Sequence, residues 1–233
     1  MNSPAQPSGL LLFDKPKGIT SHDAVALLRR KLGVRRIGHT GTLDPMATGL
    51  LIMLVGSATS AQSRLQATVK TYGGTITFGS ETDTWDAEGK VTATAPVPAL
   101  GEETVRKAVA AFSGRITQQV PPYSAVKVGG SKLYELARRG AAVPEVRREA
   151  DLKWLSWTAR PGELDFEIEC SGGTYLRSVA HELGRALGSA AHLSALRRLA
   201  IGAWRVESAV TAAELESLTP AGALAKLSPV PAP

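Results

Sequence analysis

One aspartate stands in the middle of a loop that is rich in glycine and threonine. The stretch GHTGTLDPMATGLL, residues 38–51, contains three glycines, three threonines and a single carboxylate, Asp44. Pro45 biases Asp44 toward extended backbone, glycines permit tight turns, and threonine hydroxyls can bond to nearby backbone groups. The pattern indicates a rigid loop that presents one carboxylate for nucleophilic or acid–base chemistry. An Asx turn with a purely structural purpose has the same local signature.

A second candidate is the stretch GGTYLR, residues 172–177, which precedes an apolar helical pattern. Glycines before a helix leave backbone N–H groups that can receive a phosphate. Arg177 falls in the first turn, where a cation gains nothing from the helix dipole. We therefore interpret it as facing an anion, either a phosphate or Asp44, or else as an ordinary surface arginine.

Two further stretches offer aromatic or acidic side chains. Tyr72 in TYGGTITF could stack on a base, or could be a core residue of a strand. Asp83 and Asp86 in TDTWDAEG resemble a calcium loop only loosely, because the ligand spacing is wrong and the final acidic residue is missing. A calcium site is excluded on this ground.

Charge and composition narrow the possible partners. The chain has 233 residues and a net charge of +6. Seven basic residues and one acid lie between residues 15 and 40, and five arginines and one acid lie between residues 172 and 205. Such blocks favour a polyanionic partner, although each could also be a solvated helix face. Aromatic residues are only 5%, so a stacking platform with many rings is excluded.

Other classes are disfavoured. A single cysteine, Cys170, allows no disulfide within the chain, and the four histidines show no metal-ligand spacing. The first residues lack the apolar region of a signal peptide, and no stretch approaches the ~20 apolar residues of a membrane span. We expect a cytoplasmic protein without a metal site.

The hydrophobic pattern predicts mixed secondary structure. Thr20 and Asp23 form a capping-box signature for a helix that Gly33 can end. A helix is also expected after Thr174 as its cap. The remaining predicted elements are strands at 9–14, 50–56, 71–78, 124–128, 151–157 and 163–170, and helices at 57–67, 102–112, 131–140 and 212–218. They alternate without a regular βαβ order, which favours an α+β fold.

Several motifs, in a fixed order, resemble those of one family. They span about residues 10–202 and are LLLFDKPKGITSHDAV, GHTGTLDPMATGLL, KTYGGTITFGSETDTWDAEG, PPYSAVKVGGSKLYELARRG, CSGGTYLRSVAHELG and AHLSALRRLAIG. The chain resembles the bacterial tRNA pseudouridine-55 synthases of the TruB family. The resemblance implies a pseudouridine synthase fold, with a mixed, mainly antiparallel central sheet flanked by helices and loops. It also implies a reaction that uses no cofactor and no metal.

The resemblance assigns roles residue by residue. Asp44 matches the catalytic aspartate, whose attack on ribose C1′ or uracil C6, or support of a glycal route, stays open. Tyr72 matches the tyrosine that packs on the target base and is a candidate base for the C5 proton. Arg177 matches the arginine that pairs with the aspartate. The other candidate substrate-binding residues are His39, which supports the flipped-out RNA loop, Tyr175 and Leu196, which line the uridine pocket, and Asp86 and Lys15.

The expected organisation follows the motifs. We expect a disordered lead at 1–8, a catalytic domain at 9–210 with an RNA-binding insertion at about 120–149, and a short C-terminal helix and tail at 211–233. Two departures from the family stand out. PPYSA is one residue shorter than usual before Tyr123, and the C-terminal PUA-type RNA-binding domain of many members is expected to be absent.

The implied substrate is the T-arm stem-loop of tRNA, modified at uridine 55 after base flipping by a monomeric enzyme. Two rival interpretations remain from the residues alone. One is the same chemistry on another RNA, such as ribosomal RNA, and the other is an RNA-binding or RNA-folding module without catalysis. The combination of Asp44, Tyr72 and Arg177 argues against the second, because binding alone needs no paired carboxylate.

Overall fold

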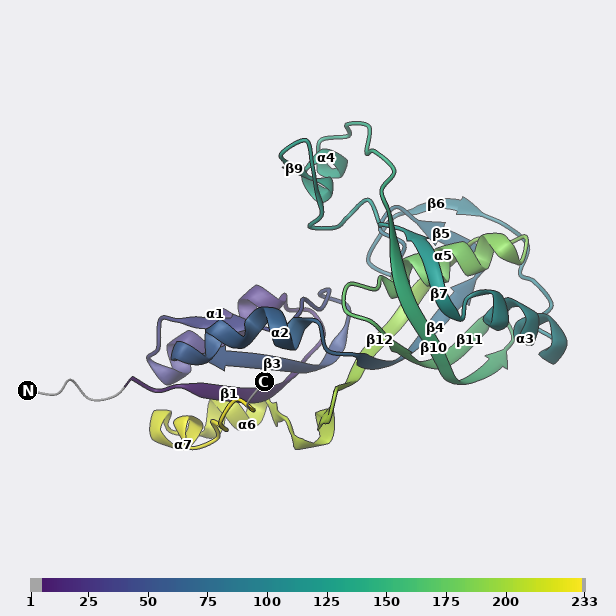
Figure 1. Ribbon diagram of the computed structural model, residues 1–233. Helices are drawn as coiled ribbons and strands as arrows, with labels where there is room; N and C mark the ends of the chain where they lie inside the picture. Colours follow the sequence, from purple (N-terminus) through teal and green to yellow (C-terminus); the bar gives the residue numbers. More distant parts are fainter. Residues whose placement is uncertain (1–5, 232–233) are drawn as a thin grey trace, which may run out of the picture. The chain divides into compact units, whose positions relative to one another are not determined.

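The computed structural model describes residues 6–231 and divides the chain into two compact units. Unit 1 contains both ends of the chain, up to Tyr72 and from Arg197 onward, and unit 2 contains Gly73–Leu196. The expected lead falls mostly on residues 1–5, which lie outside the described residues, and residues 6–8 have no regular secondary structure. Strands β4 (Lys70–Phe78) and β12 (Ala191–Ile201) contribute residues to both units (Figure 1).

Unit 1 is built on a strand that is buried on both faces. Residues of β3 (Thr48–Val55) pack alternately into two apolar clusters: Leu51 and Met53 enter one, and Leu50 and Ile52 enter the other. This explains why the sequence here is a continuous apolar run rather than an alternating one. Besides the ends of β4 and β12, the elements of unit 1 are β1 (Gly9–Lys15), α1 (Ser21–Leu32), β2 (Ile37–His39), β3 (Thr48–Val55), η1 (Gly56–Ala61), α2 (Gln62–Gln66), β13 (Trp204–Arg205), η2 (Val206–Ser208), β14 (Val210–Thr211), α6 (Ala212–Ser217) and α7 (Pro220–Leu224).

The sheet of unit 1 has the order β14-β1-β3-β12, with β2 also paired to β3 and β13 to β12. β1 and β2 are antiparallel to β3, whereas β12 runs parallel to it at Arg197↔Thr48 and Arg198↔Gly49. Gly49 has φ +103°, and a Cβ there would lie 2.3 Å from the Arg198 carbonyl oxygen. The close approach of β12 therefore requires glycine at this position.

Helix α1 begins and ends as its sequence predicts. The Thr20 side chain accepts from the Asp23 backbone N–H while the Asp23 carboxylate accepts from the Thr20 N–H. Gly33 ends the helix in the left-handed conformation. The face carrying Val25 and Leu28 is buried against the cluster that includes Leu51.

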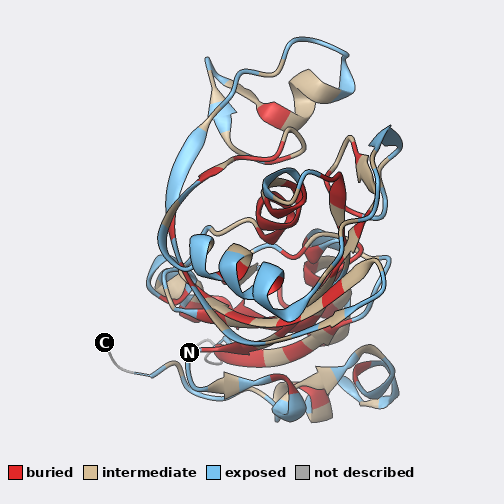
Figure 2. Ribbon diagram, turned by 90° about the vertical axis from the view of Figure 1, so that its right-hand side faces the viewer, coloured by how far each residue is buried: buried red, intermediate tan, exposed pale blue. Residues whose placement is uncertain are grey.

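Unit 2 contains an antiparallel sheet with one helix largely enclosed and another mostly exposed. Buried residues run around α5 (Leu176–Ala186), whereas only Val105 and Val109 are buried in α3 (Glu102–Ala111) (Figure 2). Gly184 lets α5 approach the start of β12, because a Cβ there would lie 2.6 Å from the Ala191 Cβ. The other elements are β5 (Ser80–Thr82), β6 (Val91–Thr94), β7 (Gly114–Gln119), β8 (Lys127–Val128), β9 (Ser131–Lys132), α4 (Leu133–Arg138), β10 (Arg147–Arg160) and β11 (Glu163–Cys170).

These elements confirm the α+β class and the mainly antiparallel sheet. Several details differ from expectation, and β7 and β12 are strands that the expected elements did not include. Thr174 does not cap α5, because its hydroxyl donates to the Ser171 carbonyl and Tyr175 occupies the N-cap position. Of the strand expected at 124–128, only Lys127–Val128 is a strand. The C-terminal tail contains a second helix, α7, with Thr219 as its N-cap.

Candidate functional site

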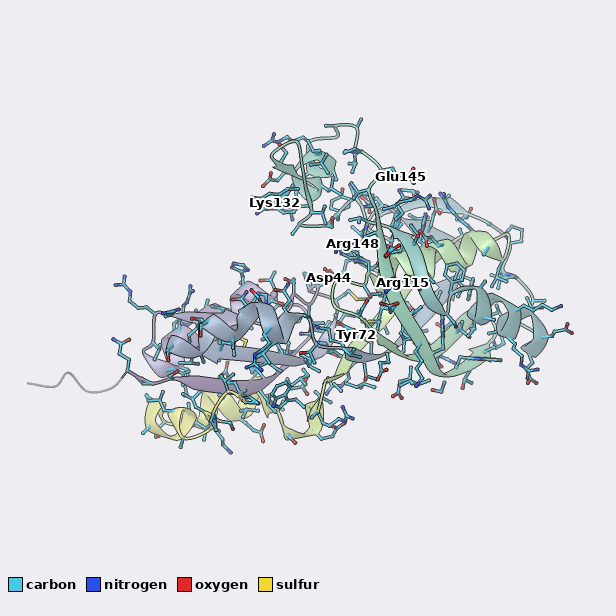
Figure 3. All side chains as sticks on the ribbon, viewed as in Figure 1. Asp44, Tyr72, Arg115, Lys132, Glu145 and Arg148 are labelled. Carbon is cyan, nitrogen blue, oxygen red and sulfur yellow. The ribbon has the colours of Figure 1, made fainter. Side chains whose placement is uncertain are left out.

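The Asp44 loop connects β2 to β3 and is held on both sides of the carboxylate. The Ser21 hydroxyl, at the start of α1, accepts from the Leu43 N–H (2.9 Å) and donates to the Leu43 carbonyl (3.1 Å). The Pro45 carbonyl accepts from the Gly18 N–H (2.8 Å). Asp44, labelled in Figure 3, stands between these two neighbours in the chain and is half-buried. The loop is therefore preorganised by contacts to its flanks.

Lys15 lies beneath this loop rather than on the surface. Its side chain is fully buried, and its ammonium donates to the carbonyls of Ile19 (2.7 Å), Pro16 (3.0 Å) and Pro45 (3.4 Å). The structure therefore shows Lys15 joining the β1–α1 loop to the residue that follows Asp44. Through these hydrogen bonds, the buried ammonium holds the start of α1 and the Asp44 loop together.

His39 and Tyr72 flank the same loop in unit 1. The His39 Nδ1 accepts from the Gly41 N–H at 3.3 Å. Burial lowers the pKa of His39, and the charges of His22 and Arg198 act in the same direction. The Tyr72 side chain is buried, and its hydroxyl accepts from the Arg198 guanidinium at 3.4 Å. Arg198 was not among the expected site residues.

In unit 2, Arg177 and Asp86 form a buried ion pair. The Arg177 Nε lies 3.7 Å from the Asp86 Oδ2, and both side chains are about 6% exposed. The guanidinium also donates to the carbonyls of Thr84 (2.9 Å) and Tyr123 (3.2 Å). Asp86 accepts from the Thr84 hydroxyl and from the Glu88 N–H through its Oδ1. The arginine is therefore oriented by fixed acceptors, which suits a group that must aim at an anion.

The loop that carries Asp86 contains a backbone conformation that bulky residues rarely adopt. Trp85 has φ +62°, the one non-glycine residue with positive φ in the range 6–231, and this costs roughly 1–3 kcal/mol. Its ring stacks on His181 of α5 at a centroid distance of 4.1 Å and an angle of 8°. Leu193 of β12 donates its N–H to the Trp85 carbonyl. α5 and β12 thus hold the strained loop in place.

Tyr175 and Leu196 are both half-buried in unit 2. The Tyr175 N–H donates to the Gln118 side-chain oxygen (2.7 Å), and the Arg148 guanidinium lies 5.7 Å from the Tyr175 ring centre. The ring is therefore placed at the N-terminus of α5 beside a cation. Leu196 lies on β12, two residues before Arg198.

The two blocks of basic residues are used differently. In the second block, Arg177 and Arg198 are buried and Arg197 forms a bidentate pair with Asp14 (2.7 and 3.0 Å). Arg177 and Arg198 are therefore enclosed, and Arg197 is held in an ion pair. Outside Lys15, the first block remains largely at the surface, with exposed side chains at Lys17, Arg29, Arg30, Arg35 and Arg36.

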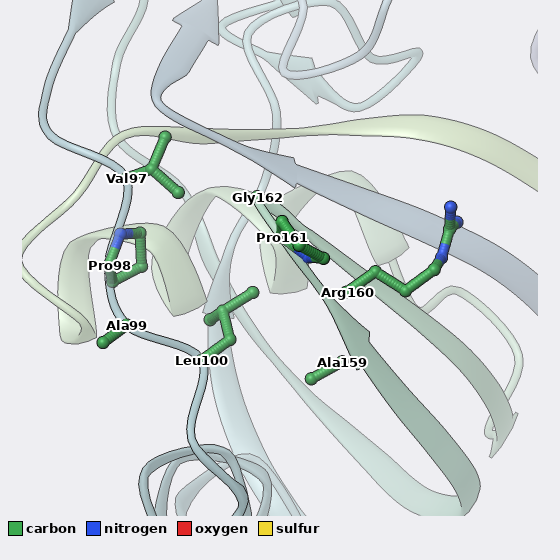
Figure 4. A pocket seen from close by; sticks show the side chains of 8 residues that line it. All are labelled: Val97, Pro98, Ala99, Leu100, Ala159, Arg160, Pro161 and Gly162. Carbon is green, nitrogen blue, oxygen red and sulfur yellow. The ribbon is translucent and has the colours of Figure 1, made fainter.

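One hollow within the described residues lies away from the candidate residues. A hollow of about 440 Å³ in unit 2 is lined by none of the candidate residues (Figure 4). Its one cation, Arg160, is already paired with Asp165 and Glu163. Within residues 6–231 no group of three or more His, Cys, Asp or Glu side chains is placed to hold a metal ion. None of the helices in that range is long and apolar enough to span a bilayer.

Comparison with solved structures supports the fold. A chain from a Cbf5-Nop10-Gar1 complex matches with a TM-score of 0.69 and 26% identity, over 95% of this chain and 60% of that chain. A chain from an H/ACA RNP bound to a substrate RNA containing 2′-deoxyuridine matches with a TM-score of 0.62 and 25% identity, over 87% of this chain and 50% of that chain. This chain therefore spans half to three fifths of those solved chains.

Family models define the class as pseudouridylate synthase. The model described as "TruB family pseudouridylate synthase (N terminal domain)" matches residues 29–176, and the one described as "tRNA pseudouridylate synthase B C-terminal domain" matches residues 177–226. A tRNA pseudouridine synthase B of Opitutus terrae is 48% identical over 90% of this chain and 88% of its own length. The tRNA pseudouridine synthase B of Aromatoleum aromaticum is 45% identical over 96% of this chain and 73% of its own length. The chain belongs to the TruB family of pseudouridylate synthases.

We predict that Lys15→Met lowers the free energy of unfolding by ~2 kcal/mol or more, because the part-buried carbonyls of Pro16, Ile19 and Pro45 lose a charged donor. Urea unfolding measures this. Lys17→Met, which removes an exposed cation two residues away, is the matched control and is expected to leave stability nearly unchanged. Unchanged stability in Lys15→Met, together with weaker RNA binding, would instead make Lys15 a direct RNA contact.

Protonation of His181 is expected to make the free energy of unfolding depend on pH. Burial lowers its pKa from the ordinary 6.5, Arg185 adds to this, and Glu81 opposes it. The unfolded chain therefore takes up a proton more readily than the folded protein, so stability falls as pH drops through about 6.5. We expect the urea midpoint to fall more between about pH 7.5 and about pH 5.5 in the wild type than in His181→Phe, which keeps a ring against Trp85. Equal falls in both proteins would rule out His181 as the source.

Proposed function

We propose that this chain converts one uridine of tRNA into pseudouridine, and that the target is uridine 55 of the T-loop. Its curated relatives named tRNA pseudouridine synthase B match over most of the chain. The observation that carries the proposal is the preorganised Asp44 loop, whose flanking residues Leu43 and Pro45 are each fixed by hydrogen bonds. A half-buried carboxylate on a fixed loop suits attack on a positioned substrate atom.

The reaction is an isomerisation, so every atom of the uridine is kept. The bond between N1 and ribose C1′ breaks, and a bond between C5 and C1′ forms. The proton on C5 leaves, and N1 gains one. The base must first be extruded from the RNA loop, because C1′ and the base edge are not reachable while it is stacked.

We assign Asp44 as the nucleophile and Tyr72 as the residue that packs on the base and accepts the C5 proton. Arg177 pairs with Asp44 in this proposal and aims the carboxylate. The buried contacts of Arg177 with Asp86 and Thr84 support such a fixed orientation. Tyr175 and Leu196 line the uridine pocket, and His39 supports the flipped-out RNA loop.

RNA affinity is proposed to come from phosphate contacts by exposed cations. The exposed members of the first basic block are suited to this, because phosphate attraction needs solvent-accessible charge. The segment 120–149, which leaves β7 and returns in β10 (Figure 1), is proposed as an RNA-binding insertion. We further propose that the protein acts as a cytoplasmic monomer on the T-arm stem-loop.

The deciding variant is Asp44→Asn, assayed by pseudouridine formation in an unmodified T-arm stem-loop. Turnover is expected to fall at least about a thousandfold, the scale on which removing a nucleophile acts. The dissociation constant for the RNA is expected to change little, since Asn keeps the shape and the loop contacts are made by neighbouring residues.

Glu103→Gln serves as the control, because it neutralises an exposed carboxylate on α3. It should retain full turnover. Retained turnover in Asp44→Asn would refute the assignment of Asp44 as the nucleophile, even if the wild type makes pseudouridine.

A further inference from the structure

Arg198 is a buried cation that has no carboxylate partner among residues 6–231. Its side chain is 1% exposed. Within residues 6–231 its guanidinium donates to the carbonyls of Leu50 (2.6 Å) and Gly41 (3.2 Å) and to the Tyr72 hydroxyl (3.4 Å). Removing a guanidinium from water without a counter-ion costs several kcal/mol. A guanidinium buried in this way is therefore expected to have a function that depends on its charge.

The two carbonyls lie at opposite ends of the Asp44 loop. Gly41 precedes Asp44 by three residues, and Leu50 lies in β3, just after the loop has ended. One guanidinium therefore fixes the separation of the two ends of the loop. Its planar fork is suited to this, because its N–H groups point in fixed and different directions.

The third acceptor of the Arg198 guanidinium is the Tyr72 hydroxyl, which is the one titratable group among the three. A cation beside a phenol favours the ionised oxygen over the neutral hydroxyl. The guanidinium carbon lies 5.9 Å from the Tyr72 ring centre, so the charge is close to the whole ring. The other charged or titratable groups around this loop are Lys15 on β1, Lys70 on β4, His39 on β2 and Asp44 itself. Lys70 directs its ammonium to the carbonyls of Gln66 and Thr68.

We propose that Arg198 is a positioning residue that ties both ends of the Asp44 loop to Tyr72 and stabilises the ionised Tyr72 oxygen for proton acceptance. The inference rests on the proposed function and deepens it. The ionised oxygen takes the proton from C5, and the C–H electron pair restores the C5–C6 double bond of the ring. The phenol then returns the proton to solvent, and N1 receives a proton in turn.

The first test needs no RNA. Tyrosinate absorbance is titrated in the wild type and in Tyr72→Phe, over the pH range in which the far-ultraviolet circular dichroism is unchanged. Subtracting the titration of Tyr72→Phe from that of the wild type gives the titration of Tyr72 alone, without the other three tyrosines. In an Arg198→Met background the Tyr72 midpoint should rise by at least about one pH unit, a tenfold weaker acid. An unchanged midpoint would overturn the electrostatic part of the inference.

Arg197→Met is the matched control. Arg197 is the preceding residue of β12 and pairs with Asp14 rather than with Tyr72. Its loss should leave the Tyr72 midpoint where it is in the wild type. A shift as large as that of Arg198→Met would mean that the strand, and not the Arg198 guanidinium, determines the Tyr72 environment.

Arg198→Lys tests the positioning part and does not depend on whether Arg198→Met folds. The lysine keeps a positive charge but cannot reproduce the fork, so single-turnover pseudouridine formation should fall at least about tenfold while Tyr72 ionises near its wild-type pH. Full turnover would overturn the positioning role. If the wild type itself makes no pseudouridine, the proposed function fails, and the RNA-free titration still decides the effect of Arg198 on Tyr72.

Discussion

The parallel pairing of β12 with β3 is the constraint on which the candidate site depends in unit 1. The two strands meet at Arg198 and Gly49, where glycine is required because a Cβ would collide with the Arg198 backbone. This pairing brings a guanidinium from late in the chain beneath a loop from early in the chain. The Asp44 loop, the start of β3 and Tyr72 then share one buried donor.

In unit 2 a buried cation also holds a loop in place, through a different set of contacts. Arg177 and His181 lie one turn apart on α5, and both contact the segment that carries Asp86. The stack of His181 on Trp85 offsets an unfavourable backbone conformation there. In both units, buried cations with backbone acceptors hold the loops that present the candidate carboxylates. Rigidity of this kind reduces the reorganisation that a reaction would otherwise require.

Local features of the sequence predict much of this structure. The capping box of α1, its glycine end and the buried run of β3 follow from short-range patterns that need no knowledge of distant residues. The family motifs add Asp44, Tyr72 and Arg177 as candidates. The sequence does not reveal the burial of Lys15 or the role of Arg198, because both depend on pairing between strands far apart in the chain. Two adjacent arginines in β12 look alike in sequence, yet one pairs with Asp14 and the other is enclosed.

The most direct test of the proposed activity is to map pseudouridine in a complete, unmodified tRNA after incubation with the protein. Nuclease fragments can be labelled chemically at pseudouridine and located by mass. A single new pseudouridine is expected, at position 55 in the T-loop. Modification at other positions only would contradict the assigned target, and a tRNA that stays unmodified would contradict tRNA as the substrate.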